Sequence, residues 1–361
     1  MRVHLFADSP RENWPSMDRY ARSLYRALRR VSPEVDFRLL IPPDPPAGFG
    51  GRLFILWRMM VYPLWARRYP ADVYHVLDHS YGHLLFALDG SRTVVTVHDV
   101  APLLFHGRRW GLSHLAWEVA WRGTQRATWL LTDSEFTKRE WAARSRKGTN
   151  RVTTIYPGVE PHFHPLDEDE RLLRRERWKV GHRRLILHVG HCQPRKNLER
   201  LLMALALLAD RKVNFLFIQV GGVFSQDQQR LLESLGLGEK VRQITQVSEE
   251  ELVGLYNAAD VFVLPSLYEG FGFPVLEAMA CGTPVVASNV ASLPEVVGDA
   301  GLLVDPRDPQ AIADAVASIL SDPALARELR RRGLERARMF QWENTARETL
   351  KVYQELWQGA L

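Results

Sequence analysis

Short apolar runs alternate with amphipathic segments of helical length along the whole chain, and this alternation predicts βαβ units around parallel sheets. Six runs in the first half predict strands, at residues 3–8, 35–41, 73–77, 93–98, 129–132 and 152–156. Six runs in the second half repeat the plan, at residues 185–190, 215–221, 241–244, 261–264, 284–287 and 301–304. The pattern therefore predicts an α/β protein with two doubly wound, Rossmann-like domains.

The boundary between the two domains is marked by a stretch without apolar periodicity. Residues 157–170 read PGVEPHFHPLDEDE, which is rich in proline and acid and is typical of a linker. The last segment instead has apolar residues at helical spacing: Trp342, Ala346, Thr349, Leu350, Tyr353 and Leu356. We therefore expect an N-terminal domain over 1–160, a C-terminal domain over 161–340 and a terminal helix over 341–361.

The composition is that of a folded globular protein. The chain has 361 residues, of which 46% are hydrophobic and 25% charged, enough for two separate cores. Its two cysteines, Cys192 and Cys281, do not imply a disulfide framework and fit a reducing compartment. The first residues lack the apolar stretch of a signal peptide, and no window approaches the roughly 20 apolar residues of a membrane span. We expect a cytoplasmic protein.

The positive charge is concentrated in the first half of the chain. Residues 1–165 hold 23 Lys and Arg against 15 Asp and Glu, a net charge of +8, whereas residues 166–361 have a net charge of −3 from 24 against 27. This asymmetry indicates an anionic partner for the first half, such as a membrane surface or a lipid phosphate, or else a solvated basic surface. No recognition motif for nucleic acid accompanies the charge, so we expect no nucleic-acid partner.

The most informative segment for chemistry is residues 259–288, which reads as a strand, a glycine-containing loop, a helix and a strand. Gly270 and Gly272 allow the loop backbone to approach a ligand, and Pro274 suits the first turn of the helix. Helix N–H groups favour a phosphate there. Two carboxylates, Glu269 and Glu277, bracket this position at the carboxyl end of a parallel strand, where α/β sheets bind ligands.

The motif EGFGFPVLE in this segment resembles the signature of retaining glycosyltransferase family 4. The resemblance extends to LHVGHCQPRKNLERLL at 187–202, VSEEELVGLYNAADVFVLPS at 247–266 and SLPEVVGDAGLLVDP at 292–306. In the first half, TVHDVAPLLF at 96–105 and LLTDSEFTKRE at 130–140 resemble bacterial mannosyltransferase-like enzymes of surface polysaccharides. The family implies the GT-B fold, with donor in the second domain, acceptor in the first, and a final helix that crosses back to the first domain.

The resemblance also implies roles for individual residues. The donor-binding positions are those that match the family's nucleotide-sugar site: Gly190, Arg195, Lys196, Glu269, Phe271, Gly272, Phe273 and Glu277. Arg195 and Lys196 match the cations that neutralise the diphosphate, with N–H groups of Asn197 and the following helix as further donors. Glu269 binds the hydroxyls of the transferred sugar. Glu277 accepts hydrogen bonds from the ribose hydroxyls.

His98 ends a predicted strand and matches a histidine that contacts the transferred sugar, so it and Glu269 are the expected catalytic residues. With fixed cations at the diphosphate, no metal or other cofactor is expected. Asp167-Glu168-Asp169 has the form of a metal-binding DxD motif but lies in the linker. The chain departs from the family at Ser16-Met17-Asp18, which stand where a glycine-rich turn is usual and put the binding of an anion there in doubt.

Residues 50–70 place Leu53, Trp57, Met60 and Leu64 on one helical stripe, with arginines on either side. This helix either rests on an anionic membrane, which favours a lipid-linked saccharide acceptor, or lies in the core of the first domain. We therefore expect a retaining transferase that moves a sugar, with mannose preferred, from a nucleotide diphosphate sugar to a saccharide. The alternatives are a phosphorylase or nucleotide-sugar epimerase on the same fold, or a non-catalytic sugar-nucleotide binding protein.

Overall fold

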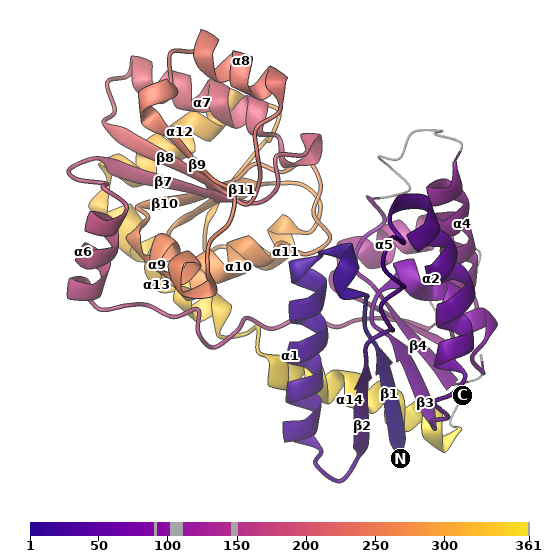
Figure 1. Cartoon of the computed structure of the whole chain (residues 1–361). Coiled ribbons are helices and arrows are strands. Elements are labelled where there is room, and N and C mark those ends of the chain that lie inside the picture. The colour runs from indigo at the N-terminus through magenta and orange to yellow at the C-terminus, as the bar shows by residue number, and fades with distance from the viewer. Residues whose placement is uncertain (90–91, 102–110, 146–150, 360–361) are drawn as a thin grey trace. The chain divides into compact units, whose positions relative to one another are not determined.

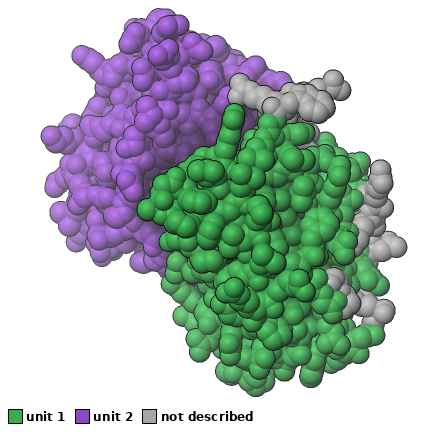
Figure 2. All heavy atoms as spheres, turned by 45° about the vertical axis from the view of Figure 1, so that its right-hand side comes forward, with its two compact units in different colours: residues 1–158, 340–361 green, residues 159–339 purple. Residues whose placement is uncertain are grey.

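The computed structural model describes the chain except for residues 90–91, 102–110, 146–150 and 360–361. Two compact units are present, one of residues 1–158 with 340–361 and one of residues 159–339 (Figure 2). Each is built around its own sheet of six parallel strands (Figure 1). The predicted α/β class with two Rossmann-like units is therefore confirmed. Part of the 96–105 motif, residues 102–105, lies outside the described residues.

The sheet of the N-terminal unit has the strand order β2-β1-β3-β4-β5-β6. Its strands are β1 (Arg2–Phe6), β2 (Asp36–Leu40), β3 (Val73–Val76), β4 (Thr93–Val97), β5 (Trp129–Thr132) and β6 (Val152–Thr154). Its helices are α1 (Pro15–Val31), α2 (Gly51–Ala66), α4 (Leu112–Thr124), α5 (Glu135–Arg144) and α14 (Trp342–Gln358), with 3-10 turns η1 (Pro10–Glu12) and η2 (His79–Phe86). The order reverses between β1 and β3, which is where such sheets bind ligands.

The terminal helix α14 packs on the N-terminal unit beside α1 (Figure 1). Its buried face follows helical spacing, and the Tyr353 hydroxyl lies 2.5 Å from Nδ1 of His75 on β3. The Thr345 hydroxyl donates to the carbonyl of Tyr156 at 2.8 Å. At Gly158 an added Cβ would lie 2.2 Å from the nitrogen of Trp342, so only glycine allows this close approach. These contacts hold the helix against residues far away in the sequence.

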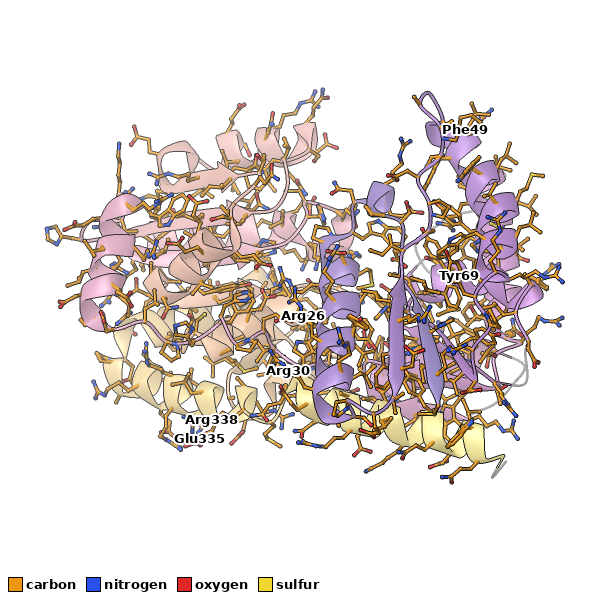
Figure 3. The ribbon with its side chains drawn as sticks, turned by 60° about the horizontal axis from the view of Figure 1, so that its bottom comes forward. Arg26, Arg30, Phe49, Tyr69, Glu335 and Arg338 are labelled. Atoms are coloured by element: carbon orange, nitrogen blue, oxygen red, sulfur yellow. The ribbon has the colours of Figure 1, made fainter. Side chains whose placement is uncertain are left out.

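Helix α2 is not a buried core helix. Only Tyr62 and Ala66 are buried in it, although it packs beside α4 and η2. Phe49 and Tyr69 lie near its two ends (Figure 3), and their rings contact Trp57 and Trp65 of α2 edge-on at 5.7 and 5.5 Å between centroids. The side chains of Leu53, Met60 and Leu64 in this helix are exposed.

The sheet of the C-terminal unit has the order β12-β11-β10-β7-β8-β9, and it reverses between β7 and β10. Its strands are β7 (Arg184–Val189), β8 (Phe215–Val220), β9 (Val241–Ile244), β10 (Val261–Leu264), β11 (Val285–Ser288) and β12 (Leu302–Val304). Its helices are α6 (Glu168–Arg177), α7 (Leu198–Asp210), α8 (Gln226–Ser234), α9 (Glu249–Ala258), α10 (Phe273–Ala280), α11 (Leu293–Val297), α12 (Pro309–Ser321) and α13 (Pro323–Ala337), with 3-10 turns η4 (Pro194–Lys196) and η5 (Gly238–Lys240).

Helices cover both faces of this second sheet. Figure 1 shows α7, α8 and α12 on one face and α9, α10 and α13 on the other. Buried aliphatic and aromatic side chains of the strands, such as Ile186, Phe217 and Val263, form one core with α7 and α12. Because both faces are buried, the strands read as continuous apolar runs. Polar loops follow the carboxyl ends of these strands.

Candidate donor site

The candidate donor site lies at the point where the strand order of the C-terminal sheet reverses. Strands β7 and β10 are neighbours there, with Ile186 paired to Val261. The loop after β7 carries Arg195 and Lys196, and the loop after β10 carries Glu269. Parallel strands bring their carboxyl ends to one edge, so two loops 73 residues apart in sequence meet.

A buried cluster of charges joins the two loops. The Lys196 ammonium donates to Oε1 of Glu269 at 2.5 Å, and Nη1 of Arg195 lies 3.4 Å from Oε2 of the same carboxylate. The hydroxyl of Ser266 also donates to Oε1 at 2.6 Å. Lys196 is 6% exposed and Glu269 7% exposed. The structure therefore brings three of the predicted donor-binding side chains into one contact, and Ser266 is an additional partner.

This cluster carries a positive charge overall. Burial raises the pKa of Glu269, but the charges of Lys196 and Arg195, with hydrogen bonds from Lys196 and Ser266, lower it further, so the net shift is downward. The carboxylate is therefore ionised at neutral pH, and two cations face one anion. A surplus positive charge in a buried position suits an anionic ligand such as a diphosphate.

The turn before α10 places backbone groups beside the same cluster. Gly272 caps the helix with φ of 110°, and a Cβ there would lie 2.7 Å from Cδ2 of Leu293, so glycine is required. The Ser292 hydroxyl lies 2.9 Å from the carbonyls of both Glu269 and Phe271 and fixes the loop from the other side. The rings of Phe271 and Phe273 meet edge-on, with centroids 5.1 Å apart. In the first turn of α10, Pro274 has no N–H, and the nitrogens of Val275 and Leu276 donate to the carbonyl of Gly272 at 3.0 and 3.4 Å.

Two further predicted positions have clear local roles. Gly190 follows β7 with φ of 154°, and a Cβ there would lie 3.4 Å from Cε of Lys196, so the lysine stem runs directly beside this loop. Glu277 on α10 is buried, and the Tyr256 hydroxyl of α9 donates to its Oε2 at 2.8 Å. Tyr256 thus holds Glu277 in a fixed orientation. Sequence reasoning missed Tyr256 because it lies 21 residues away from Glu277.

Asn197 serves the fold rather than a phosphate. Its side-chain amide donates to the carbonyls of Pro265 and Pro306 at 2.9 and 2.6 Å, so both of its N–H groups are used. The residue also adopts a left-handed conformation, φ 61°, at the start of α7. Its backbone N–H donates to the carbonyl of Pro194 at 3.1 Å, so the donors of Asn197 are used within the fold, where the side chain joins three loops at the edge of the sheet. The expected N–H donors of the following helix stay a prediction.

His98, the predicted catalytic histidine, lies in the N-terminal unit, directly after β4. Its Nδ1 is 2.6 Å from Oδ2 of Asp133, and its Nε2 is 2.8 Å from the carbonyl of Leu77. Since both partners are acceptors, both ring nitrogens carry hydrogen. Burial lowers the pKa of His98, but the charge of Asp133 and the hydrogen bond to it raise the pKa to about 10. The side chain is a fixed imidazolium.

The remaining sequence features of interest have structural roles. Residues 16–18 form the first turn of α1 in place of a glycine-rich turn, and Asp18 pairs with Arg22 at 2.8 Å. Asp167 of the DxD-like sequence caps α6 by accepting from the nitrogen of Glu170. Among the described residues, no group of three or more His, Cys, Asp or Glu side chains is arranged to hold a metal ion.

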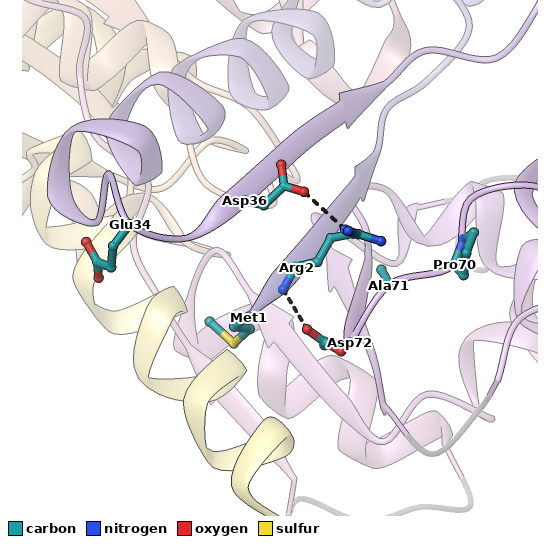
Figure 4. Close-up of a pocket in the computed structure, with 7 residues that line it drawn as sticks. All are labelled: Met1, Arg2, Glu34, Asp36, Pro70, Ala71 and Asp72. Atoms are coloured by element: carbon teal, nitrogen blue, oxygen red, sulfur yellow. Dashed lines mark hydrogen bonds and ion pairs between the residues drawn. The ribbon is translucent and has the colours of Figure 1, made fainter.

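A pocket at the opposite edge of the N-terminal sheet is not part of this chemistry. It lies at the amino ends of β1 and β2, and Arg2 in it contacts both Asp36 and Asp72 (Figure 4). The backbone nitrogen of Arg2 donates to Asp72 at 2.7 Å, and its guanidinium donates to Asp36 at 3.1 Å.

Known proteins match the chain over both units. Residues 169–338 match the model described as glycosyl transferases group 1, and residues 2–163 match that of glycosyltransferase family 4. O-antigen chain mannosyltransferase B of Escherichia coli is 33% identical over 297 residues, which cover 80% of this chain and 76% of the relative. The chain is a family 4 glycosyltransferase.

Two further matches add detail. A D-inositol 3-phosphate glycosyltransferase of Corynebacterium glutamicum (strain R) is 34% identical over 216 residues, 56% of this chain and 51% of the relative. The solved structure of the Anabaena protein HepE in complex with UDP-glucose superposes with a TM-score of 0.76 and 18% identity, covering 97% of this chain and 99% of that one. At that identity the likeness concerns the fold, which is GT-B in this glycosyltransferase.

Proposed function

We propose that this glycosyltransferase transfers a sugar, with mannose preferred, from a nucleotide diphosphate sugar to a saccharide or lipid-linked saccharide, with retention of configuration and without a metal ion. The observation that carries the proposal is the buried cluster of Lys196, Arg195 and Glu269 at the start of α10. It supplies fixed cations to a diphosphate and a carboxylate to sugar hydroxyls. The match to an O-antigen mannosyltransferase supports mannose and a saccharide acceptor.

In the proposed reaction the acceptor hydroxyl attacks the anomeric carbon from the side of the leaving group. The bond from that carbon to the phosphate oxygen breaks, and the departing phosphate takes the proton of the hydroxyl. Lys196 and Arg195 stabilise the negative charge that grows on the diphosphate. Glu269 orients the sugar, the N–H groups at Phe271 to Phe273 bind it and the phosphate, and Glu277 binds the ribose. His98 supplies a fixed positive charge.

The donor is the first point to test. We expect one class among UDP-, GDP- and ADP-sugars to raise the melting temperature of the protein, because a ligand that binds only the native state stabilises it. The shift should persist in EDTA. Arg195→Ala should weaken binding of that donor roughly 10- to 100-fold, since a hydrogen bond to a charged group contributes about 1.5–3 kcal/mol. Calorimetric titration measures both effects.

Arg200→Ala is the matched control for this experiment. Arg200 lies one helical turn further along α7 and donates to Oδ1 of Asn197 rather than to Glu269, so its loss should leave donor affinity within a factor of about two. Unchanged affinity in Arg195→Ala would refute the diphosphate assignment. Loss of binding in EDTA would refute metal independence.

We also propose that the N-terminal unit rests on an anionic membrane through α2. Large apolar side chains are exposed along one stripe of the helix: Leu53, Leu56, Met60 and Leu64. Arg52, Arg67 and Arg68 beside the stripe are exposed, and α2 contains no acidic residue. This combination suits an interfacial helix. None of the described helices is long and apolar enough to span a bilayer.

Replacing Met60 and Leu64 with Glu should lower binding to vesicles that contain phosphatidylglycerol at least tenfold, because burial of each apolar side chain contributes about 1.5–3 kcal/mol. These residues are 67% and 62% exposed, so the fold should tolerate the change. Co-sedimentation measures the binding. The matched control replaces Leu172 and Leu173 of α6, which are 50% and 63% exposed in the other unit. Equal binding of both double variants would contradict the proposal.

A further inference from the structure

The N-terminal unit has a second polar edge, at the point where its own strand order reverses. Phe6 of β1 pairs with Val76 of β3, so Asp8 and Asp78, two residues beyond, emerge side by side. Val97 of β4 pairs with Thr132 of β5, which likewise brings the next residues, His98 and Asp133, together. The carboxyl ends of four neighbouring strands therefore carry three aspartates and one histidine.

This edge is acidic, and its nearest cations are already paired. We define the acidic edge as Asp8, Glu12, Asp78 and Asp133. Nη1 of Arg58 lies 2.6 Å from Oε1 of Glu12, and Nδ1 of His98 lies 2.6 Å from Oδ2 of Asp133. Burial and the charge of Asp78 raise the pKa of Asp8 well above its ordinary value. This raised pKa favours the protonated form of Asp8. Burial raises the pKa of Asp78, but nearby His79 and His98 and the N–H of Ser80 lower it further, so Asp78 carries a negative charge that no described arginine or lysine contacts directly.

Several buried polar atoms at this edge have no hydrogen-bond partner within the described part of the chain. They are both carboxylate oxygens of Asp8, Oδ1 of Asp133, Nε2 of His79 and Oγ of Ser80. Asp133 is 2% and His79 5% exposed, and Nδ1 of His79 is 3.4 Å from Asp78, which places the ring at the acidic edge. Buried polar groups normally find partners, so this concentration indicates a polar ligand.

The hydrogen-bonding capacity of these atoms indicates which class of ligand they can bind. Carboxylate oxygens accept hydrogen bonds from hydroxyl groups, whereas the imidazole and the serine hydroxyl also donate, so together they complement the hydroxyls of a sugar ring. A phosphate offers no hydrogen-bond donor to these oxygens when ionised, and its negative charge is repelled by that of Asp78. Residues 16–18, which follow this edge in the chain, form the first turn of helix α1 rather than a glycine-rich turn.

We propose that the acidic edge is an acceptor subsite that binds the hydroxyls of an uncharged sugar and excludes acceptors with a phosphate on the ring. This assignment rests on the proposed transfer function and specifies its acceptor. Asp8 is the residue that contacts the acceptor most directly, because neither of its oxygens has a partner among the described residues. Asp133 acts as a positioning residue through His98.

The test compares methyl α-mannopyranoside with its 6-phosphate. Ligand-observed NMR of the full chain without donor should show binding of the neutral glycoside and none of the phosphate at equal concentration. With the donor present, kcat/KM for the neutral glycoside should exceed that for the phosphate at least 100-fold. Equal or better use of the phosphorylated glycoside would overturn the proposal, as would the absence of binding by either compound.

The Asp8→Asn variant tests whether Asp8 is responsible for the preference for the neutral glycoside over its phosphate. It should raise KM for the neutral glycoside at least tenfold and reduce the preference over the phosphate at least tenfold, while donor affinity changes less than twofold. Asp72→Asn, at the opposite edge of the same sheet, is the matched control and should change none of these values. An Asp8→Asn variant with unchanged KM and preference would overturn the proposal.

These outcomes separate the acceptor subsite from the transfer function. A wild-type chain that binds no nucleotide sugar in calorimetry would contradict the proposed function, whereas the NMR experiment on acceptors alone would still decide what the acidic edge binds. Conversely, a chain that binds donor and transfers equally to both glycosides would retain its proposed function and lose the acceptor subsite.

Discussion

Replacing Glu269 with Gln should lower kcat/KM for sugar transfer about 10²- to 10⁴-fold, since two charged hydrogen bonds of roughly 1.5–3 kcal/mol each are weakened or lost. In the native chain this carboxylate contacts Lys196 at 2.5 Å and Arg195 at 3.4 Å. In the proposed reaction it both holds the two cations in place for the diphosphate and binds the sugar. Steady-state kinetics with the identified donor measures the loss.

The variant also leaves the Lys196 ammonium buried without a counter-charge, which destabilises a fold by roughly 3–5 kcal/mol. Lys196→Met combined with Glu269→Gln removes both charges and should recover most of that stability without recovering activity. Ser266→Ala, which removes only the 2.6 Å hydrogen bond to Glu269, should cost less than about tenfold in kcat/KM. A folded Glu269→Gln variant with near-native kcat/KM would contradict the role.

The fold was predictable from the sequence because the strands of both sheets are buried on two faces and appear as separate apolar runs. The bounds of β5, β9 and β10 agree with the predicted ones to the residue. Seven others end one or two residues earlier than predicted, as β1 ends at Phe6 rather than Asp8, whereas β12 ends at the predicted residue and β11 one residue later, at Ser288. The spacing of apolar residues could not show whether α2 faces a membrane or the protein core, because both kinds of helix have apolar residues along one side.

The contacts within the candidate donor site could not be predicted from the sequence. The two loops that carry Lys196 and Glu269 follow strands that apolar patterning alone does not place side by side; the strand order supplies that adjacency. The role of Asn197 was misassigned because an asparagine beside two cations in sequence resembles a phosphate ligand, whereas its amide is used by two distant carbonyls. The sequence did not identify Asp8 and Asp78 as functional residues, since single aspartates after strands are common on protein surfaces.

The two units place opposite charges at equivalent topological positions. In the C-terminal sheet the reversal between β7 and β10 carries Lys196 and Arg195 around one carboxylate, which suits a nucleotide diphosphate. In the N-terminal sheet the reversal between β1 and β3 carries Asp8 and Asp78, which suits hydroxyl donors. Under the proposed function, the anionic donor binds at the positive cluster and the uncharged acceptor at the acidic edge, and the difference in charge favours this division.

Replacing Asp133 with Asn should destabilise the protein by roughly 3–5 kcal/mol at pH 6.5, because the variant leaves the His98 imidazolium buried without its counter-ion. The side chains of His98 and Asp133 are 8% and 3% exposed, and Nδ1 of His98 lies 2.6 Å from Oδ2 of Asp133. Since the pKa of folded His98, about 10, exceeds its ordinary value of 6.5, the pair's contribution is fully present below pH 6.5 and is lost as pH rises through 10. Urea unfolding of both proteins from pH 6.5 to 10 measures this.

The difference in unfolding free energy between wild type and Asp133→Asn should therefore be largest at pH 6.5 and shrink toward pH 10. Asp72→Asn is a matched control, because this more exposed carboxylate lies at the amino edge of the same sheet and accepts from the backbone of Arg2. It should change stability by about 1 kcal/mol or less at every pH, the usual contribution of one hydrogen bond. A difference for Asp133→Asn that stays constant with pH would show that His98 does not carry the buried positive charge.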